Sequence, residues 1–261
     1  MSSRDNKFMI LRTAALVGLA AVSLSTFAIP AQAALITNGG FETNTGSGQI
    51  GFNGVAVTGW TTTGFNFIFA PGTADTSGAF GADGFLILAG PNNGNANGLP
   101  ASSPNGGFFV VADGNYGPPK DKGRMTAPIT QTISGLTPGA TYQVGFYWAA
   151  AQQLGIVGAT QQHWTVGFGA STQNTATFNL PSQGFSGWMF QTFNFTADAT
   201  SDVLSFLAVG NVAAPPFLLL DGVNVTLGTS QTPEPGSVSL MLSGLVLVAG
   251  GVAFRSKTTK S

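Results

Sequence analysis

The feature that most constrains the fold is a series of short segments, rich in Phe, Val, Thr and Tyr, that recur between clusters of Gly, Pro and Asn. Between Ala34 and Thr229 no stretch has the sustained apolar spacing of an amphipathic helix, so the pattern predicts an all-β chain. The predicted strands are Gly64 to Phe69, Gly84 to Leu88, Phe108 to Ala112, Ile129 to Ile133, Thr141 to Ala149, His163 to Phe168, Thr175 to Leu180, Met189 to Thr196, Val203 to Val209 and Phe217 to Leu227. Strands of this number and length suit a two-sheet sandwich.

Alternation within these strands predicts which side chains form the core. In the strongest strand, Tyr142, Val144, Phe146 and Trp148 share one face. The opposite face, with Gln143, Gly145, Tyr147 and Ala149, is expected to face outward or to line a shallow groove. By the same rule Trp164 is expected to pack inside.

Two connections also have a predicted form. Thr137-Pro138-Gly139 indicates a turn, because Pro presets φ and Gly tolerates a positive φ. The low-complexity segment from Gly90 to Gly107 has little to bury and is expected to be a long, mobile loop.

Both ends of the chain have the form of targeting segments. Residues 1–33 combine basic residues, an apolar run from Ala14 to about Ile29 and the small-residue sequence Pro30-Ala31-Gln32-Ala33, which is typical of a signal peptide cleaved after Ala33. At the other end, residues 237–254 are apolar and would form a helix of roughly 27 Å, just enough to cross a bilayer core. The basic end beginning at Arg255 would remain on the cytoplasmic side.

The order Pro233-Glu234-Pro235, apolar helix and basic end resembles the PEP-CTERM sorting signal of exopolysaccharide-producing Gram-negative bacteria. The resemblance covers residues 229–261. It implies that an exosortase in the inner membrane recognises this segment and removes it, and that the rest of the chain is exported to the cell surface or the extracellular matrix. An ordinary single-pass anchor is the alternative. Residues 34–228 then form one β-sandwich ectodomain.

Charge and cysteine content exclude some classes of function. Six of the nine Lys and Arg residues lie in the two targeting segments, leaving Lys120, Lys122 and Arg124 in the ectodomain. Three cations cannot form a continuous phosphate-binding face, so nucleic acid is excluded as a partner. The chain has no Cys, so its stability must come from a core, for which 21 Phe and four Trp supply ample apolar area.

Several motifs in the ectodomain resemble those of the galactose-binding-like jelly roll of carbohydrate-binding modules. The motifs are Asn38-Gly39-Gly40-Phe41-Glu42, Thr58-Gly59-Trp60, Ile129 to Ile133 followed by Gly135 to Tyr142, Trp188 with Phe193 to Ala197, and Leu219 to Val225. The resemblance implies a two-sheet jelly-roll sandwich, flanked here by the signal helix and the transmembrane helix. That fold hosts sugar binding, adhesion and purely structural roles.

A calcium site is one implication of this resemblance. In the resembled modules, the Glu that ends the first motif and the Asp of the last strand bind a structural Ca²⁺, which points to Glu42 and Asp221 here. The strand parity of Asp221 matches that of Leu219 and Val223, so its carboxylate is expected to point inward and to need donors or a cation. The alternatives are that both carboxylates cap backbone N–H groups, and that a bulge at Gly222 reverses the parity.

Sugar binding would use aromatic faces and amides. The candidates are Trp60, Tyr116, Tyr147, Gln152, Gln153 and His163. For each of these residues a place in the core or in a solvated loop is the competing interpretation.

No catalytic constellation is evident, because the only histidine has no nucleophile elbow upstream and the eight acids of the ectodomain cannot be paired across a cleft. The sequence therefore predicts a non-catalytic protein. Asp113-Gly114-Asn115-Tyr116 is the one stretch arguable as a catalytic site, and a plain turn is its other interpretation.

Three functions remain as hypotheses. The first is a weak carbohydrate-binding protein of the cell surface or exopolysaccharide matrix. The second is a structural or adhesive matrix protein that self-associates through exposed Phe and Asn-rich surfaces. The third is a glycan-processing enzyme.

Overall fold

The computed structural model describes residues 35–90, 98–114, 126–211 and 215–228. These four ranges are all-β, and within them no helix has the length and hydropathy needed to cross a bilayer. The predicted signal helix, the sorting motif at Pro233 to Pro235 and the predicted transmembrane helix lie outside the described residues.

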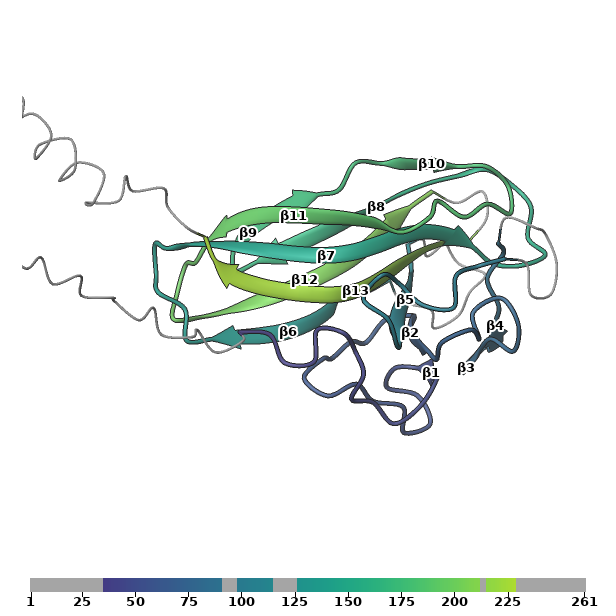
Figure 1. The fold of residues 1–261 in the computed structure, drawn as a ribbon, viewed down its shortest axis with the longest axis horizontal. Coiled ribbons are helices and arrows are strands. Elements are labelled where there is room, and N and C mark those ends of the chain that lie inside the picture. Colours follow the sequence, from purple (N-terminus) through teal and green to yellow (C-terminus); the bar gives the residue numbers. More distant parts are fainter. Residues whose placement is uncertain (1–34, 91–97, 115–125, 212–214, 229–261) are drawn as a thin grey trace, which may run out of the picture. The chain divides into compact units, whose positions relative to one another are not determined.

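The described strands form two larger antiparallel sheets and one small hairpin (Figure 1). Their bounds are β1 Gly48–Gln49, β2 Asn66–Phe69, β3 Ala79–Gly81, β4 Gly84–Leu86, β5 Phe109–Asp113, β6 Ile129–Ser134, β7 Thr141–Gln152, β8 Thr160–Phe168, β9 Ser171–Asn174, β10 Phe178–Leu180, β11 Met189–Thr196, β12 Ser201–Gly210 and β13 Pro216–Leu227. One sheet has the order β1-β2-β5-β13-β7-β11, and the other has the order β10-β8-β12-β6, with β9 paired to β8. The hairpin is β3-β4.

Each of the ten predicted strands coincides with an observed strand, although Thr175 to Leu180 is a strand only from Phe178 onward. The structure adds β1, β3 and β9, which have two, three and four residues. The predicted turn is also confirmed: Ala140 N donates to Thr137 O at 3.0 Å, and Gly139 has a φ of 80°. A positive φ at the third position makes this a type II turn.

The main core lies between the two larger sheets. The predicted inward residues of β7 and Trp164 of β8 are all buried in it. Phe206 of β12 lies near its centre, with ring centroids 5.0 Å from Phe146 and 6.0 Å from Trp164. The prediction for these core faces is therefore confirmed.

A second apolar cluster covers part of the outer face of the six-stranded sheet. It contains alternate residues of four strands, including Phe109 of β5 and Phe217 of β13, beneath side chains of the 65–89 segment such as Leu88. Ala149 of β7, whose face was expected to lie outward, is buried in this cluster. Both faces of the sheet are therefore covered along β2 and β5. Over β11 and the adjoining parts of β7 and β13, only the face toward the main core is covered.

Truncation of the main core has a predictable cost. Phe206→Ala is expected to lower the free energy of unfolding by about 3–5 kcal/mol, because it removes a fully buried ring among other rings. Phe85→Ala, at a side chain that is 65% exposed, should change it by about 0.5 kcal/mol or less. Chemical denaturation followed by Trp fluorescence measures both, and equal losses would contradict this placement of the core.

Candidate functional site

The first candidate site is organised by a bulge in β13. Asp221 pairs with Tyr147 and Asn224 pairs with Gly145, so two residues of β13 oppose one residue of β7. Gly222 occupies the bulge with a φ of 59°, a conformation that suits glycine.

The bulge reverses the two faces of β13. Leu218 and Leu220 point into the main core before it, whereas Val223 and Val225 do so after it. Asp221 therefore shares its face with Leu219 but not with Val223. The predicted match in parity between Asp221 and Val223 was wrong, because Gly222 forms the bulge that was the alternative. Its carboxylate is nonetheless completely buried, because another segment of the chain covers it.

That cover is the segment from Ser102 to Phe108. Ser103 Oγ donates a hydrogen bond to Asp221 Oδ2. Asn105 Nδ2 donates to Oδ1 over 3.4 Å, and Gly222 N donates to the same oxygen at 2.6 Å. The later part of the predicted mobile loop is thus fixed in place, and Ser103 itself is buried, which corrects the expectation that this segment has little to bury.

Glu42 lies on the solvent side of the same junction. Its Oε1 accepts a hydrogen bond from Phe108 N at 2.8 Å. A Cβ atom on Gly107 would lie 1.8 Å from Oε1, so this approach requires glycine. The chain leading to Glu42 is tied to the bulge by Val223 N, which donates to Gly39 O at 2.9 Å.

Electrostatics at the junction are unfavourable for a charged Asp221. Burial raises the pKa of its carboxyl from 3.8 to about 7, and the nearby Glu42 carboxylate adds to this rise. Hydrogen bonds from Ser103, Gly222 and Asn105 oppose the rise in pKa without cancelling it. None of these three donors is a cation. Among the described residues, the Asp221 carboxylate therefore has only neutral donors, with the Glu42 carboxylate nearby.

The donor set fits a calcium ion. The carboxylates of Glu42 and Asp221 are hard oxygen ligands of the kind that Ca²⁺ prefers, whereas Asn105 directs its Nδ2 toward Asp221. The described residues contain no group of three or more His, Cys, Asp or Glu side chains, so neutral oxygens would have to complete the shell. Both carboxylates also accept a backbone N–H, as the capping alternative predicted. Calcium binding by Glu42 and Asp221 therefore stays a proposal, in which the ion would neutralise the buried charge.

The raised pKa of Asp221 predicts how stability depends on pH in the absence of divalent ions. The folded protein holds the Asp221 proton more tightly than the unfolded chain does. Protonation of Asp221 therefore contributes fully to the free energy of unfolding below pH 3.8, and this contribution is lost as pH rises to about 7. At about 1.4 kcal/mol per pKa unit, the loss relative to Asp221→Asn is at most about 4 kcal/mol. Urea denaturation of both proteins in chelator measures it, and parallel pH profiles would refute the assignment.

Calcium should reverse that loss. At neutral pH, excess Ca²⁺ is expected to raise the melting temperature of the wild type by several degrees, since an ion that binds only the native state stabilises it by mass action. Asp221→Ala should not respond. If a chelator leaves the melting temperature of wild type and variant unchanged alike, no such site exists.

The structure describes five of the six predicted sugar-binding residues and does not bring these five together. Trp60 is 3% exposed, and its Nε1 donates to Asn38 O at 3.0 Å within the core. Gln152 is completely buried, with its Nε2 bonded to Thr160 Oγ1 at 2.8 Å and its Oε1 to Gln183 N at 2.6 Å. Neither can present a face to a ligand, so these two predictions were wrong.

The other four predicted residues have different positions. His163 lies within β8, opposite Val209 of β12, and is half-buried. Gln153 is half-buried, and its carbonyl accepts a hydrogen bond from Gln183 Nε2 at 3.1 Å. Tyr116 lies outside the described residues. Tyr147 is the one that lies on an uncovered sheet face.

The second candidate site is that uncovered face, here called the outer strip. It consists of the outward-facing residues of β7, β11 and the last part of β13. They are Thr141, Gln143, Gly145, Tyr147, Phe190, Thr192, Asn194, Thr196, Asn224 and Thr226. All ten are uncharged. Of these ten, only Gln143, Gly145 and Tyr147 were expected from the sequence to lie on this face.

An aromatic pair occupies one end of the outer strip. Tyr147 and Phe190 are cross-strand partners with ring centroids 5.0 Å apart, inclined at 56°. Phe190 is 55% exposed. A Cβ on Gly145 would lie 3.2 Å from the Phe190 ring and 2.9 Å from the Asn224 amide, so glycine at that position leaves room for both.

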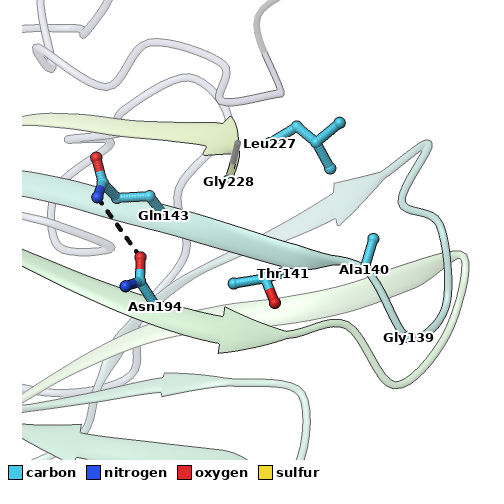
Figure 2. A pocket seen from close by; sticks show the side chains of 7 residues that line it. All are labelled: Gly139, Ala140, Thr141, Gln143, Asn194, Leu227 and Gly228. Carbon is cyan, nitrogen blue, oxygen red and sulfur yellow. Dashed lines mark hydrogen bonds between the residues drawn. The ribbon is translucent and has the colours of Figure 1, made fainter. Parts of the chain in front are cut away.

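A hollow of about 530 Å³ lies at the other end of the outer strip. It is lined by Gly139, Ala140, Thr141, Gln143, Asn194, Leu227 and Gly228. Figure 2 shows Gln143 and Asn194 facing each other from β7 and β11, with Gln143 Nε2 3.5 Å from Asn194 Oδ1. The outer strip thus combines exposed aromatic area, amides and a shallow depression.

The sequence contained a signal for Phe190 that was not used. Phe193 and Phe195 alternate with Thr192, Asn194 and Thr196 in the same strand. Strict alternation puts Phe190 on the polar face, where a large apolar side chain is unexpected and points to an interaction.

Asp113, part of the arguable catalytic stretch, ends β5 and is buried. Gly114 N donates to Pro216 O at 2.7 Å, which joins this end of β5 to the start of β13. Asn115 and Tyr116, the rest of the stretch, lie outside the described residues.

Comparisons with known proteins give likeness in shape alone. No protein-family model and no curated protein matches the chain. Among solved structures, the CBM22-1 xylan-binding domain from Paenibacillus barcinonensis Xyn10C is 11% identical, with 71% of this chain and 95% of that one covered and a TM-score of 0.34. The K3 cleaved adhesin domain of Lys-gingipain from Porphyromonas gingivalis is 12% identical, with 71% and 100% covered and a TM-score of 0.34.

A phage protein gives a likeness of the same size. The enzymatically active domain of tailspike protein 4 from bacteriophage CBA120 is 18% identical, with 75% of this chain but only 21% of that chain covered and a TM-score of 0.34. Scores of this size carry no argument about function.

Proposed function

We propose that the protein is an exported, non-catalytic β-sandwich of jelly-roll type that binds polysaccharide weakly at the cell surface or in the exopolysaccharide matrix. The observation that carries this proposal is the outer strip, where the exposed Phe190 ring and the half-buried Tyr147 ring lie beside amides on an uncovered sheet face. Sugar rings offer apolar C–H faces to aromatic side chains and hydroxyl groups to amides. Because the strip is shallow, the expected affinity is low.

The proposed route of export depends on the two ends of the chain. A signal peptide would direct the chain across the inner membrane, and an exosortase would recognise Pro233-Glu234-Pro235 with the helix and Arg255 behind it. With only Lys120, Lys122 and Arg124 as cations, the ectodomain suits polysaccharide better than nucleic acid.

A non-catalytic role is supported by the position of the carboxylate pair. Glu42 and Asp221 are brought together, but Asp221 is covered by Ser103 and Asn105. A glycosidase needs both of its carboxyl groups beside the scissile bond. The pair suits a structural ion better than it suits an accessible substrate.

Substitution of the aromatic pair tests the proposed function. Tyr147→Ala and Phe190→Ala should each weaken retention of the purified protein in gels containing polysaccharide, because each removes stacking area worth about 0.5–1.5 kcal/mol. The dissociation constant should rise by roughly 2- to 10-fold for each change. Phe85→Ala, which removes an exposed ring outside the strip, is the matched control and should bind as wild type does.

One observation favours the second candidate, a self-associating matrix protein. Phe80 and Phe85 of the β3-β4 hairpin are both exposed, with ring centroids 5.3 Å apart, and Phe52 lies 6.0 Å from Phe80. Assembly that grows with concentration in light scattering, disappears in Phe85→Ala and occurs without affinity for any glycan would favour this candidate over the first.

A further inference from the structure

Charge on the described residues is of one sign. They include seven acidic residues, namely Glu42, Asp75, Asp83, Asp113, Asp198, Asp202 and Asp221, whereas the three cations of the ectodomain, Lys120, Lys122 and Arg124, lie outside them. The outer strip has no charged member, and the acid nearest to it in the strand pairing, Asp221, is completely buried. A polymer that carries carboxylate or sulfate groups would find no positive partner among the ten members of the outer strip.

Strand register arranges the outer strip in rows. Phe190 and Tyr147 form the first row, and Thr192, Gly145 and Asn224 form the second. The third row is Asn194, Gln143 and Thr226, and the hollow near Thr141 follows it.

These rows give the outer strip an elongated form. Residues on one face of a strand recur about every 7 Å, so the path from Tyr147 to Thr141 covers roughly 20 Å, whereas three strands span only about 10 Å across. Its long axis runs parallel to β7, and a site of this form suits several linked sugar units better than one.

The chemistry changes along that axis. Aromatic area lies at the Phe190 end, and amides that can donate and accept hydrogen bonds lie in the middle at Asn224, Gln143 and Asn194. Thr hydroxyl groups flank them. Gly145 keeps the floor between the rings and the amides low, since a larger residue there would meet both Phe190 and Asn224.

We propose that the outer strip binds one uncharged polysaccharide chain laid parallel to β7, with a sugar ring against Phe190 and later units over the amides toward the hollow at Thr141. This proposal rests on the proposed function and specifies its ligand. Binding depends on stacking and neutral hydrogen bonds, so it is insensitive to ionic strength.

The test compares polymers of different charge with the purified protein. Affinity electrophoresis in soluble xylan, β-glucan and galactan should retard it equally at low and high salt, and polyuronate or sulfated polymers should not. Calorimetry with a series of neutral oligosaccharides should show affinity that rises with chain length before reaching a plateau.

Variants at both ends of the axis place the chain on the outer strip. Phe190→Ala and Asn194→Ala should each lower the affinity for the best neutral polymer by roughly 2- to 10-fold. Val203→Ala and Phe85→Ala, at exposed side chains outside the strip, are controls that should leave it unchanged. Unchanged melting temperatures confirm that the variants fold.

The possible failures are distinguishable. Retention by anionic polymers that salt abolishes, or equal affinity for a monosaccharide and a long chain, overturns this inference and leaves polysaccharide binding intact. Neutral binding that both strip variants retain in full overturns the assignment to this face. The absence of retention by any polymer overturns the proposed function as well.

Discussion

The bulge at Gly222 and Val223 is the constraint on which both candidate sites depend. A regular β13 would keep one face inward along its whole length, and Asn224 and Asp221 could not both lie on the same side of the sheet as they do here. With the extra residue, Asp221 meets the 102–108 segment and Asn224 reaches the outer strip. The bulge also supplies Gly222 N to the buried carboxylate, which lessens the cost of its burial.

The two candidate sites follow from unequal covering of one sheet. Along β2 and β5 the six-stranded sheet is covered on both faces, and every residue of Asn66–Phe69 and Phe109–Asp113 is buried. The 65–89 segment provides that second cover and ends before it reaches β11. The β11 side therefore keeps a free face, and the small and polar residues there allow it to stay in water without a large apolar patch.

Much of the fold could be predicted from the sequence, because long strands carry an alternation that packing preserves. The strands that escaped prediction have two to four residues, too few for a period-two pattern to be recognised. Burial of Asp221 was predicted from a strand parity that the bulge reverses. The segment that buries Asp221 instead contains Ser103, more than 100 residues away in the sequence. Trp60 shows a different limit of prediction from sequence. A Trp that follows a turn has the pattern of an exposed stacking surface for a sugar, and only the tertiary structure shows that Phe206 packs against it.

The free edge of β11 bears on the choice between a binding face and a self-assembling sheet. In the described part of the sheet β11 pairs only with β7, so alternate backbone groups of this strand face outward, as a template for another strand. Two of its carbonyls are already occupied: Thr192 O accepts from Gln191 Nε2 at 2.8 Å, and Asn194 O accepts from Gln173 Nε2 at 2.7 Å. A second copy adding a strand here would first have to break both bonds. The face beside this edge needs no such exchange to receive a sugar ring, which is why the outer strip is the better-supported surface for a ligand.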